Sequence, residues 1–371
     1  MPESYDAILI VSFGGPDGPD DVIPFLENVL RGRNVPRERM LEVADHYYHF
    51  GGRSPINDQN RALIAALEQE LAEHGPRLPI YWGNRNWHPL LADTLRQMAK
   101  DGIKRALAFV TSAYSSYSGC RQYREDIARA QQSVAAGGSP AEEQQAGRLL
   151  LRVDKLRVFF NHPGFIEPMI ESARAALEQV PAERREAARL VFTAHSIPLA
   201  MAAGCRYEEQ LREASRLVVA GLENSLSLWE RAGVRVLHWD LVYQSRSGPS
   251  QQPWLEPDIG EFIRRLHDSE PEVKDLVVVP IGFISDHLEV LYDLDTEAQA
   301  LCKELGINMI RSATVGTHPR FVRMIRELIE ERLTDAPERL AVGTLGPFHD
   351  ECADDCCLYT PAGRMSCPRS S

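Results

Sequence analysis

The chain has 371 residues, a formal net charge of -12 and a pI near 5.5. This length exceeds the size at which a single core usually stops growing, so we expect two domains. An acidic chain without a basic run argues against binding to nucleic acid or to an anionic membrane surface. No stretch approaches the roughly 18 apolar residues of a transmembrane helix, and the N-terminus lacks the basic start of a signal peptide. We therefore expect no membrane span and a cytoplasmic location, with a weak amphipathic membrane contact left open.

Short apolar runs alternate with amphipathic stretches along the chain. Runs of this kind predict buried strands of a parallel sheet, and the stretches between them predict crossover helices. The predicted strands span residues 7–13, 78–83, 105–111, 157–160, 190–195, 234–243, 276–281 and 309–313.

The two halves of the chain have a similar layout. Each opens with a strand that breaks into a polar turn containing proline, IVSFGGP at 10–16 and VFTAHSIP at 191–198. This predicts two similar doubly wound, Rossmann-like α/β domains, at 1–150 and 151–335, followed by a cysteine-rich extension at 336–371. The small polar stretch at 133–148 is the predicted linker. Ligands of such folds bind at the carboxyl ends of the strands, and a cleft between the domains is the expected place.

His195 stands at the carboxyl end of one predicted strand, just before the turn at Pro198. An imidazole in that position can ligate a metal or accept a proton near neutral pH. A hydrogen-bonded loop histidine is the alternative interpretation, and the residue alone does not decide between them.

Glu289 lies three residues after Asp286, which is a reasonable helix N-cap, so the two could form a capping box. Glu289, Asp293 and Glu297 also recur every four residues, which places them on one face of a helix. Such a row of carboxylates could conduct cations or protons into a cleft, or could be a solvated surface.

Two further segments are candidate ligand walls, YHFGGRSPINDQN at 48–60 and TSAYSSYSGCRQYRED at 111–126. Aromatic rings with hydroxyl tips suit a flat, largely apolar ligand with polar edges. They also suit ordinary core packing, which is the favoured interpretation when these segments are taken alone.

The combination of motifs resembles the ferrochelatase family from about Ile8 to about Arg332. The motifs that carry this resemblance are FGGP, FGGRSP, TAHSIP, YQSRSGPSQQPWLEPDI and PIGFISDHLEVLYDLD, in that order. The segments SFGGPDGPDDVIPFLENVLRGR, PIYWGNRNW, SAYSSYSGCRQYRED and RSATVG resemble the actinobacterial branch. The resemblance implies a chelatase-type fold and insertion of Fe²⁺ into coproporphyrin III, an enzymatic step of haem biosynthesis.

The family's functional residues carry over to matching positions. The histidine of its TAHS motif falls on His195 and the glutamate of its DHLE motif on Glu289, which implies that this pair handles the metal and the pyrrole protons. Ser54 and Tyr123 match positions that contact the porphyrin. Some relatives have a tyrosine facing the iron where this chain has Phe13, so an axial phenolate is not expected, although Phe13 can pack on the ring.

The chemistry behind this assignment is general. Two N–H protons must leave a free porphyrin as Fe²⁺ enters, and ferrous iron accepts imidazole and carboxylate ligands. The four propionates of coproporphyrin need cationic or hydroxyl partners. Arg31, Arg33 and Arg53 are the candidates, and each could instead be a solvated surface arginine.

Three cysteines crowd into CADDCC at 352–357. Together with Cys120, the residues Cys352, Cys356 and Cys357 resemble the [2Fe–2S] ligand set of many ferrochelatases, with Cys367 as a possible substitute. A zinc site on the same thiols and a free thiol tail are the alternatives. Cys205 and Cys302 lie in helical patterns and are predicted to be core residues.

Several other functions stay open from the sequence: a protoporphyrin IX ferrochelatase, a chelatase for another metal, a non-catalytic haem or iron carrier, and a bare iron–sulfur electron carrier. We expect a monomer whose partners are a porphyrin and ferrous iron, with transient contacts to neighbouring enzymes of haem synthesis.

Overall fold

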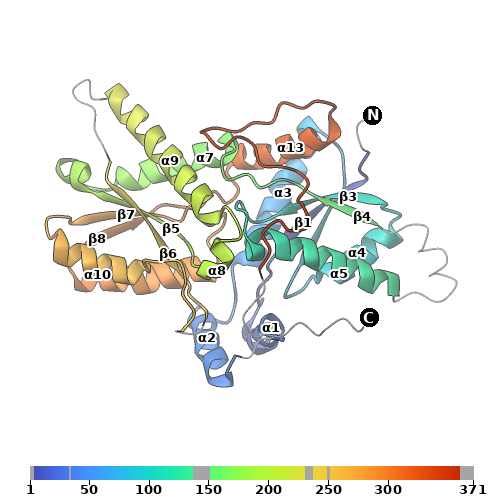
Figure 1. Cartoon of the computed structure of the whole chain (residues 1–371), viewed down its shortest axis with the longest axis horizontal. Helices are drawn as coiled ribbons and strands as arrows, with labels where there is room; N and C mark the ends of the chain where they lie inside the picture. Colours follow the sequence, from blue (N-terminus) through green and yellow to red (C-terminus); the bar gives the residue numbers. More distant parts are fainter. Residues whose placement is uncertain (1–3, 33–34, 137–150, 230–236, 249–250, 360–371) are drawn as a thin grey trace.

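The computed structural model describes residues 4–32, 35–136, 151–229, 237–248 and 251–359. It contains two four-stranded parallel sheets with helices against them (Figure 1). The first sheet has the order β2-β1-β3-β4 and the second the order β6-β5-β7-β8. The two orders are equivalent, since β1 and β5 occupy the same position in their sheets. The predicted α/β class with two similar parallel sheets is confirmed.

The elements of the first half follow the predicted alternation of strands and helices. The strands are β1 (Ala7–Ser12), β2 (Ile80–Asn84), β3 (Arg105–Val110) and β4 (Arg152–Lys155). The helices are α1 (Val22–Val29), α2 (Arg37–His49), α3 (Ile56–His74), α4 (Leu91–Lys100), a π-helical turn η2 (Tyr117–Arg121) and α5 (Gln122–Ala136). Figure 1 shows α1 and α2 projecting from the body of the molecule.

The second half repeats the pattern. Its strands are β5 (Arg189–His195), β6 (Trp239–Gln244), β7 (Asp275–Val279) and β8 (Asn308–Arg311). Its helices are α7 (Pro163–Leu177), α8 (Leu199–Ala202), α9 (Tyr207–Trp229), α10 (Ile259–Ser269), α11 (Leu288–Val290), the π-helix η4 (Leu291–Ala298), α12 (Gln299–Glu304) and α13 (Pro319–Leu333).

The core follows the two-residue period of the strands. In β1, Ile8 and Ile10 belong to a large central core that also contains Leu190 and Phe192 of β5. Leu9 faces the other way, into a core with α4 and α5. One continuous apolar core therefore joins the two sheets, because α3, α7 and α13 contribute side chains to it.

The strand predicted at 157–160 is wrong: residues 152–155 form β4 instead, paired with β3. Val158, Phe159 and Phe160 are buried all the same. The Phe159 ring stacks on Phe109, with ring centroids 5.3 Å apart. An apolar run buried by packing gives the same sequence signal as a buried strand.

The predicted linker also divides differently. Residues 133–136 belong to α5, and the rest of the linker lies outside the described residues. The segment after α13 has no helix or strand within its described part, as expected for the extension. It packs against the second half, because Val342 N–H donates to the Asn161 carbonyl and Thr344 N–H to Glu213. It also contacts the first half, because Arg121 donates to the Asp354 carbonyl.

Candidate active site and cysteine centre

His195 lies at the carboxyl end of β5, in register with Gln244 of β6. The Tyr207 hydroxyl donates to the His195 carbonyl at 3.1 Å and fixes the backbone there. The imidazole Nδ1 lies 2.5 Å from the Ser196 carbonyl oxygen. A carbonyl can only accept, so Nδ1 carries the proton of the neutral ring and Nε2 keeps its lone pair. His195 therefore presents a basic nitrogen to its surroundings.

Glu289 lies in α11, the short helix after β7, and faces that nitrogen. The distance from His195 Nε2 to Glu289 Oε1 is 3.8 Å. The two side chains are 34% and 48% exposed, so both are accessible to a ligand. Ligand atoms about 2.1 Å from one metal lie about 3.0–3.8 Å apart for angles of roughly 90–130°. The pair is thus too far apart for a hydrogen bond and close enough to share one metal ion.

The capping-box interpretation of Glu289 is wrong. The N-cap of α11 is His287, whose Nδ1 accepts from the Glu289 N–H at 3.3 Å. Asp286 instead accepts a hydrogen bond from Arg311 at 2.9 Å. The Glu289 carboxylate is consequently not used to close the helix.

The three carboxylates of the predicted row are electrostatically coupled along η4. Burial raises the pKa of Asp293 to about 7; the hydrogen bond from Ser245 opposes this rise, and the charges of Glu289 and Glu297 add to it. Burial also raises the pKa of Glu297. Gln244 holds the row in place, since its Nε2 donates to the Glu289 carbonyl at 3.1 Å and to Asp293 at 3.3 Å. A carboxyl group with a pKa near 7 can take up and release protons at neutral pH.

The first half brings a different set of groups to its own strand ends. Phe13 follows β1 and is 38% exposed. The Arg85 guanidinium, which follows β2, lies 5.8 Å from the Phe13 ring centroid and 4.5 Å from that of Tyr123. It is also paired with Asp126. Arg85 was missed from the sequence, although its place directly after a predicted strand was a usable signal.

The remaining candidates for porphyrin contact differ in accessibility. Ser54 is 4% exposed, and its N–H donates to the Pro16 carbonyl at 2.9 Å. Tyr123 is 5% exposed and packs in the core beneath α4. Arg31 is exposed, whereas Arg53 is paired with Asp58. Arg33 lies outside the described residues. The parts these residues play toward a porphyrin stay predictions.

Helix α2 of the first half contacts η4. We call Glu289, Asp293 and Glu297 the acidic row, and the sequence did not indicate this contact beside it. His46 stacks on Tyr292 of η4, with ring centroids 3.8 Å apart and 13° between the planes. Burial raises the pKa of the Tyr47 hydroxyl, and the charge of Glu289 raises it further. Tyr47 and Glu289 therefore lie close enough to interact, and residues from both halves surround the carboxylate.

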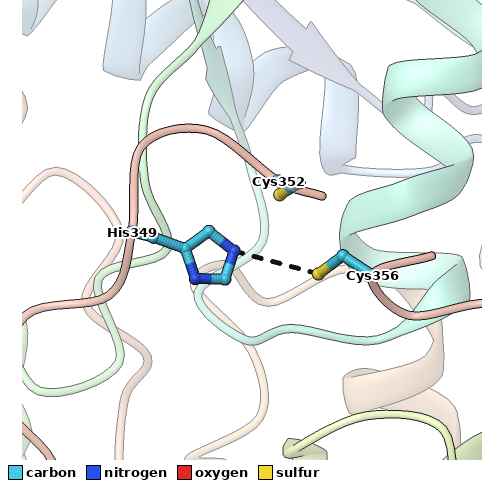
Figure 2. Close-up of side chains that lie close together, drawn as sticks. All are labelled: His349, Cys352 and Cys356. Carbon is cyan, nitrogen blue, oxygen red and sulfur yellow. Dashed lines mark hydrogen bonds between the residues drawn. The ribbon is translucent and has the colours of Figure 1, made fainter. Parts of the chain in front are cut away.

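The cysteines predicted as one group converge near η2. A hydrogen bond from the Cys352 thiol lowers the pKa of Cys120 to about 5. Burial raises this pKa, whereas the positive charge of Lys155 lowers it further. Cys356 Sγ lies 3.7 Å from Cys357 Sγ and 3.8 Å from His349 Nε2. Figure 2 shows His349, Cys352 and Cys356 pointing toward one another. We call the group of Cys120, His349, Cys352, Cys356 and Cys357 the cysteine centre.

Arginines of α5 and η2 hold the extension in place around this centre. Arg121 donates to the carbonyls of Asp354 and Cys356 at 2.6 and 2.9 Å. Arg124 donates to the carbonyl of Cys352 at 3.1 Å. A cavity of about 560 Å³ borders the centre and is lined in part by His349, Cys356 and Cys357. The donor atoms are thus preorganised and have open space beside them.

The other cysteines are separate from the centre or undescribed. Cys302 is fully buried and burial raises the pKa of its thiol to about 12, which confirms it as a core residue. Cys205 is partly buried against the core and donates to the Met201 carbonyl at 3.3 Å. Cys367 lies outside the described residues.

Comparison with known proteins identifies the class of this enzyme. The family model described as Ferrochelatase matches residues 5–333. The chain belongs to the ferrochelatase family, and it is an enzyme of porphyrin metallation in haem biosynthesis with ferrous iron as its metal substrate.

Individual relatives match over nearly the whole chain. A protein named ferrochelatase from Rhodopirellula baltica is 56% identical over 96% of this chain and 94% of its own length. A protein named coproporphyrin III ferrochelatase from Streptomyces coelicolor is 50% identical over 95% of this chain and 93% of its own. The solved structure of SirB from Bacillus subtilis with Fe³⁺ is a distant likeness, at 14% identity and a TM-score of 0.49, covering 89% of this chain and 96% of that one. Within the described residues, no helix is long and apolar enough to cross a membrane.

Proposed function

We propose that this ferrochelatase acts on coproporphyrin III and that His195 and Glu289 carry out the insertion of Fe²⁺. The observation that supports the catalytic pair is the 3.8 Å separation of His195 Nε2 and Glu289 Oε1 in a solvent-accessible position. The support for the substrate is the name coproporphyrin III ferrochelatase of several relatives at about 50% identity. Protoporphyrin IX is the alternative, because the Rhodopirellula baltica relative has the plain name ferrochelatase.

His195 acts as the proton acceptor in this proposal. Its Nε2 lone pair takes a pyrrole proton as the metal displaces it, while the Ser196 carbonyl holds the Nδ1 proton and orients the ring. Glu289 then receives the proton or binds the incoming Fe²⁺ together with Nε2. Either role requires an imidazole and a carboxylate on the same side of the ring.

The acidic row completes the path to solvent. Asp293 is protonated about half of the time near neutral pH because burial raises its pKa to about 7. It can therefore pass a proton from Glu289 toward Glu297 without first paying a large energetic penalty. Gln244 keeps Asp293 and the Glu289 backbone in one arrangement during this transfer.

We also propose that the cysteine centre holds an iron–sulfur group of the [2Fe–2S] type. Thiolates are the ligands that such clusters take, and the thiols of Cys120, Cys352, Cys356 and Cys357 converge from η2 and from the extension. The low pKa of Cys120 favours the thiolate form. When bound, the group would tie the extension to η2 and could exchange one electron. No step of the insertion passes through it.

The test is an anaerobic insertion assay of the wild type with Fe²⁺ and each of the two porphyrins. We expect kcat/KM to be at least about tenfold higher with coproporphyrin III, because a site built for four carboxylates loses two partners with protoporphyrin IX. Equal or higher values with protoporphyrin IX would contradict the proposed substrate.

The catalytic pair is tested in the same assay. We expect His195→Ala and Glu289→Ala each to lower kcat by at least about 100-fold while circular dichroism stays unchanged. Exposed His267, on α10, provides the control variant His267→Ala. A normal insertion rate in His195→Ala would overturn the assignment of that residue.

A further inference from the structure

The cysteine centre contains one donor that is not a thiol. Ligand atoms of His349, Cys352 and Cys356 all lie within 4.8 Å of one another (Figure 2). Among the described residues, these three side chains form the group of histidine, cysteine or acidic residues whose ligand atoms are this close together. His349 has no role in the ligand set predicted from the sequence.

The separations fit the edges of a metal coordination sphere. A tetrahedral metal with bonds of about 2.3 Å to sulfur and about 2.0–2.1 Å to nitrogen places neighbouring ligand atoms about 3.6–3.8 Å apart. His349 Nε2 lies 3.8 Å from Cys356 Sγ. The two atoms form a hydrogen bond at this distance, and the same separation suits two ligands of one metal.

The His349 ring is held in its position by neighbours. It lies against Phe348, with ring centroids 4.0 Å apart. Phe348 is buried, and its carbonyl accepts a hydrogen bond from Arg339 at 2.5 Å. The imidazole itself is exposed, so this contact restricts the ring on one side and leaves its nitrogens open to a metal.

Cys357 is the poorer fourth ligand. It follows Cys356 directly, and its φ of 54° places it in the left-handed region that disfavours a residue with a side chain. Although its sulfur lies near that of Cys356, it is not a member of the set formed with Cys352.

We infer that His349 is a ligand of the metal centre, with Cys120, Cys352 and Cys356 as the thiolates and Cys357 as a buried structural thiol. Cys120 joins the set through its contact with Cys352. This inference rests on the proposed metal centre and does not depend on which porphyrin the enzyme uses. One imidazole in place of a thiolate makes the bound group less negative, which raises its reduction potential relative to a centre with four thiolates.

The experiment compares the full-length wild type with His349→Ala, His349→Cys and Cys357→Ser, all purified anaerobically. Iron, acid-labile sulfide and zinc are measured per chain. The dithionite-reduced proteins are then examined by pulsed EPR for coupling to an imidazole nitrogen, with ¹⁵N-histidine labelling to identify its source. His267→Ala is the control for removal of an unrelated exposed histidine.

We expect one bound centre per chain and an imidazole coupling in the wild type, in Cys357→Ser and in His267→Ala. His349→Ala should lose at least half of the metal. His349→Cys should keep the metal, lose the nitrogen coupling and have a lower reduction potential, which separates ligation from a general folding defect. If the metal is zinc, replacement by Co²⁺ and the same variants give the same comparison.

Three results would overturn the inference: no bound metal in the wild type, no nitrogen coupling to its centre, or loss of metal in Cys357→Ser with full retention in His349→Ala. Insertion activity is measured in parallel. Inactive protein with an intact centre contradicts the proposed function and leaves the ligand assignment standing.

Discussion

The two sheets have equivalent strand orders, yet the side chains at their carboxyl ends differ in kind. Where β1 leads to Phe13, the equivalent strand β5 ends in His195. Where β2 leads to Arg85, which is paired with Asp126, β6 leads to Ser245, which donates to Asp293. One half therefore presents an apolar ring and a neutralised cation, and the other an imidazole and an acidic row.

This difference shows that the scaffold and the chemistry are separable. The backbone hydrogen bonds and apolar core of each sheet require only buried strands, and both halves satisfy that requirement in the same way. The residues after each strand are free of this constraint, so function can differ between halves that share a fold. In this molecule the second half carries the groups that can move protons, and the first half contributes aromatic and cationic surroundings.

The largest effect should come from making the two strand ends alike. His195→Phe gives β5 the side chain that follows β1, and we expect the insertion rate to fall by at least about 100-fold, because the proton acceptor is lost. Phe13→Ala, the matching change in the other half, should lower the rate by less than about tenfold, because it removes packing alone. Initial rates with Fe²⁺ under anaerobic conditions check this. Similar losses in both variants would break the proposed division of roles.

The acidic half should also show a distinct dependence of stability on pH. The pKa of Asp293 is about 7 in the folded protein, because burial raises it above the ordinary aspartate value of 3.8. The folded state thus binds the Asp293 proton more tightly than the unfolded state does. Protonated Asp293 therefore adds fully to the free energy of unfolding below about pH 4, and this stabilisation is lost as the pH rises through about 7. Since one pKa unit corresponds to about 1.4 kcal/mol, Asp293→Asn should be more stable than the wild type by a few kcal/mol at pH 8.

Urea unfolding at pH 5 and pH 8 measures this difference. The variant Asp335→Asn, at an exposed residue after α13, serves as the control. If Asp293→Asn changes the free energy of unfolding equally at both pH values, Asp293 does not titrate as described and the acidic row is no proton path.

A smaller effect is expected from the cation of the first half. The side chains of Arg85 and Asp126 are 7% and 15% exposed. Arg85→Met therefore removes one of the positive charges that neutralise the mostly buried Asp126 carboxylate. Arg129 still pairs with Asp126, which limits the expected loss to about 2 kcal/mol in the free energy of unfolding. Arg96→Met, which breaks an exposed pair with Asp93, should cost less than about 0.5 kcal/mol.

Thermal or urea unfolding gives both values, and the double variant Arg85→Met/Asp126→Leu should recover most of the loss. A cost for Arg85→Met no larger than that of Arg96→Met would mean that this pair is effectively solvated, and that the first half has no neutralised cation at its strand ends.

The sequence by itself determined the alternation of buried strands and helices, and with it the two parallel sheets. The TAHS and DHLE motifs singled out His195 and Glu289 through their resemblance to the ferrochelatase family, because the local position of each residue left its role open. The roles of both residues stay predictions. The fold prediction succeeds because the signal for a buried strand or an amphipathic helix is carried by neighbouring residues.

Tertiary structure alone decided the rest. It placed β4 at 152–155 rather than at 157–160, since Phe159 is buried by Phe109 and not by strand pairing. It gave the N-cap of α11 to His287, because Asp286 is bound by Arg311. It also brought His349 beside Cys356, and His46 onto Tyr292. Each outcome depends on a contact between residues far apart in the chain, or on a competition between two partners for one side chain, and a local pattern contains no information about either.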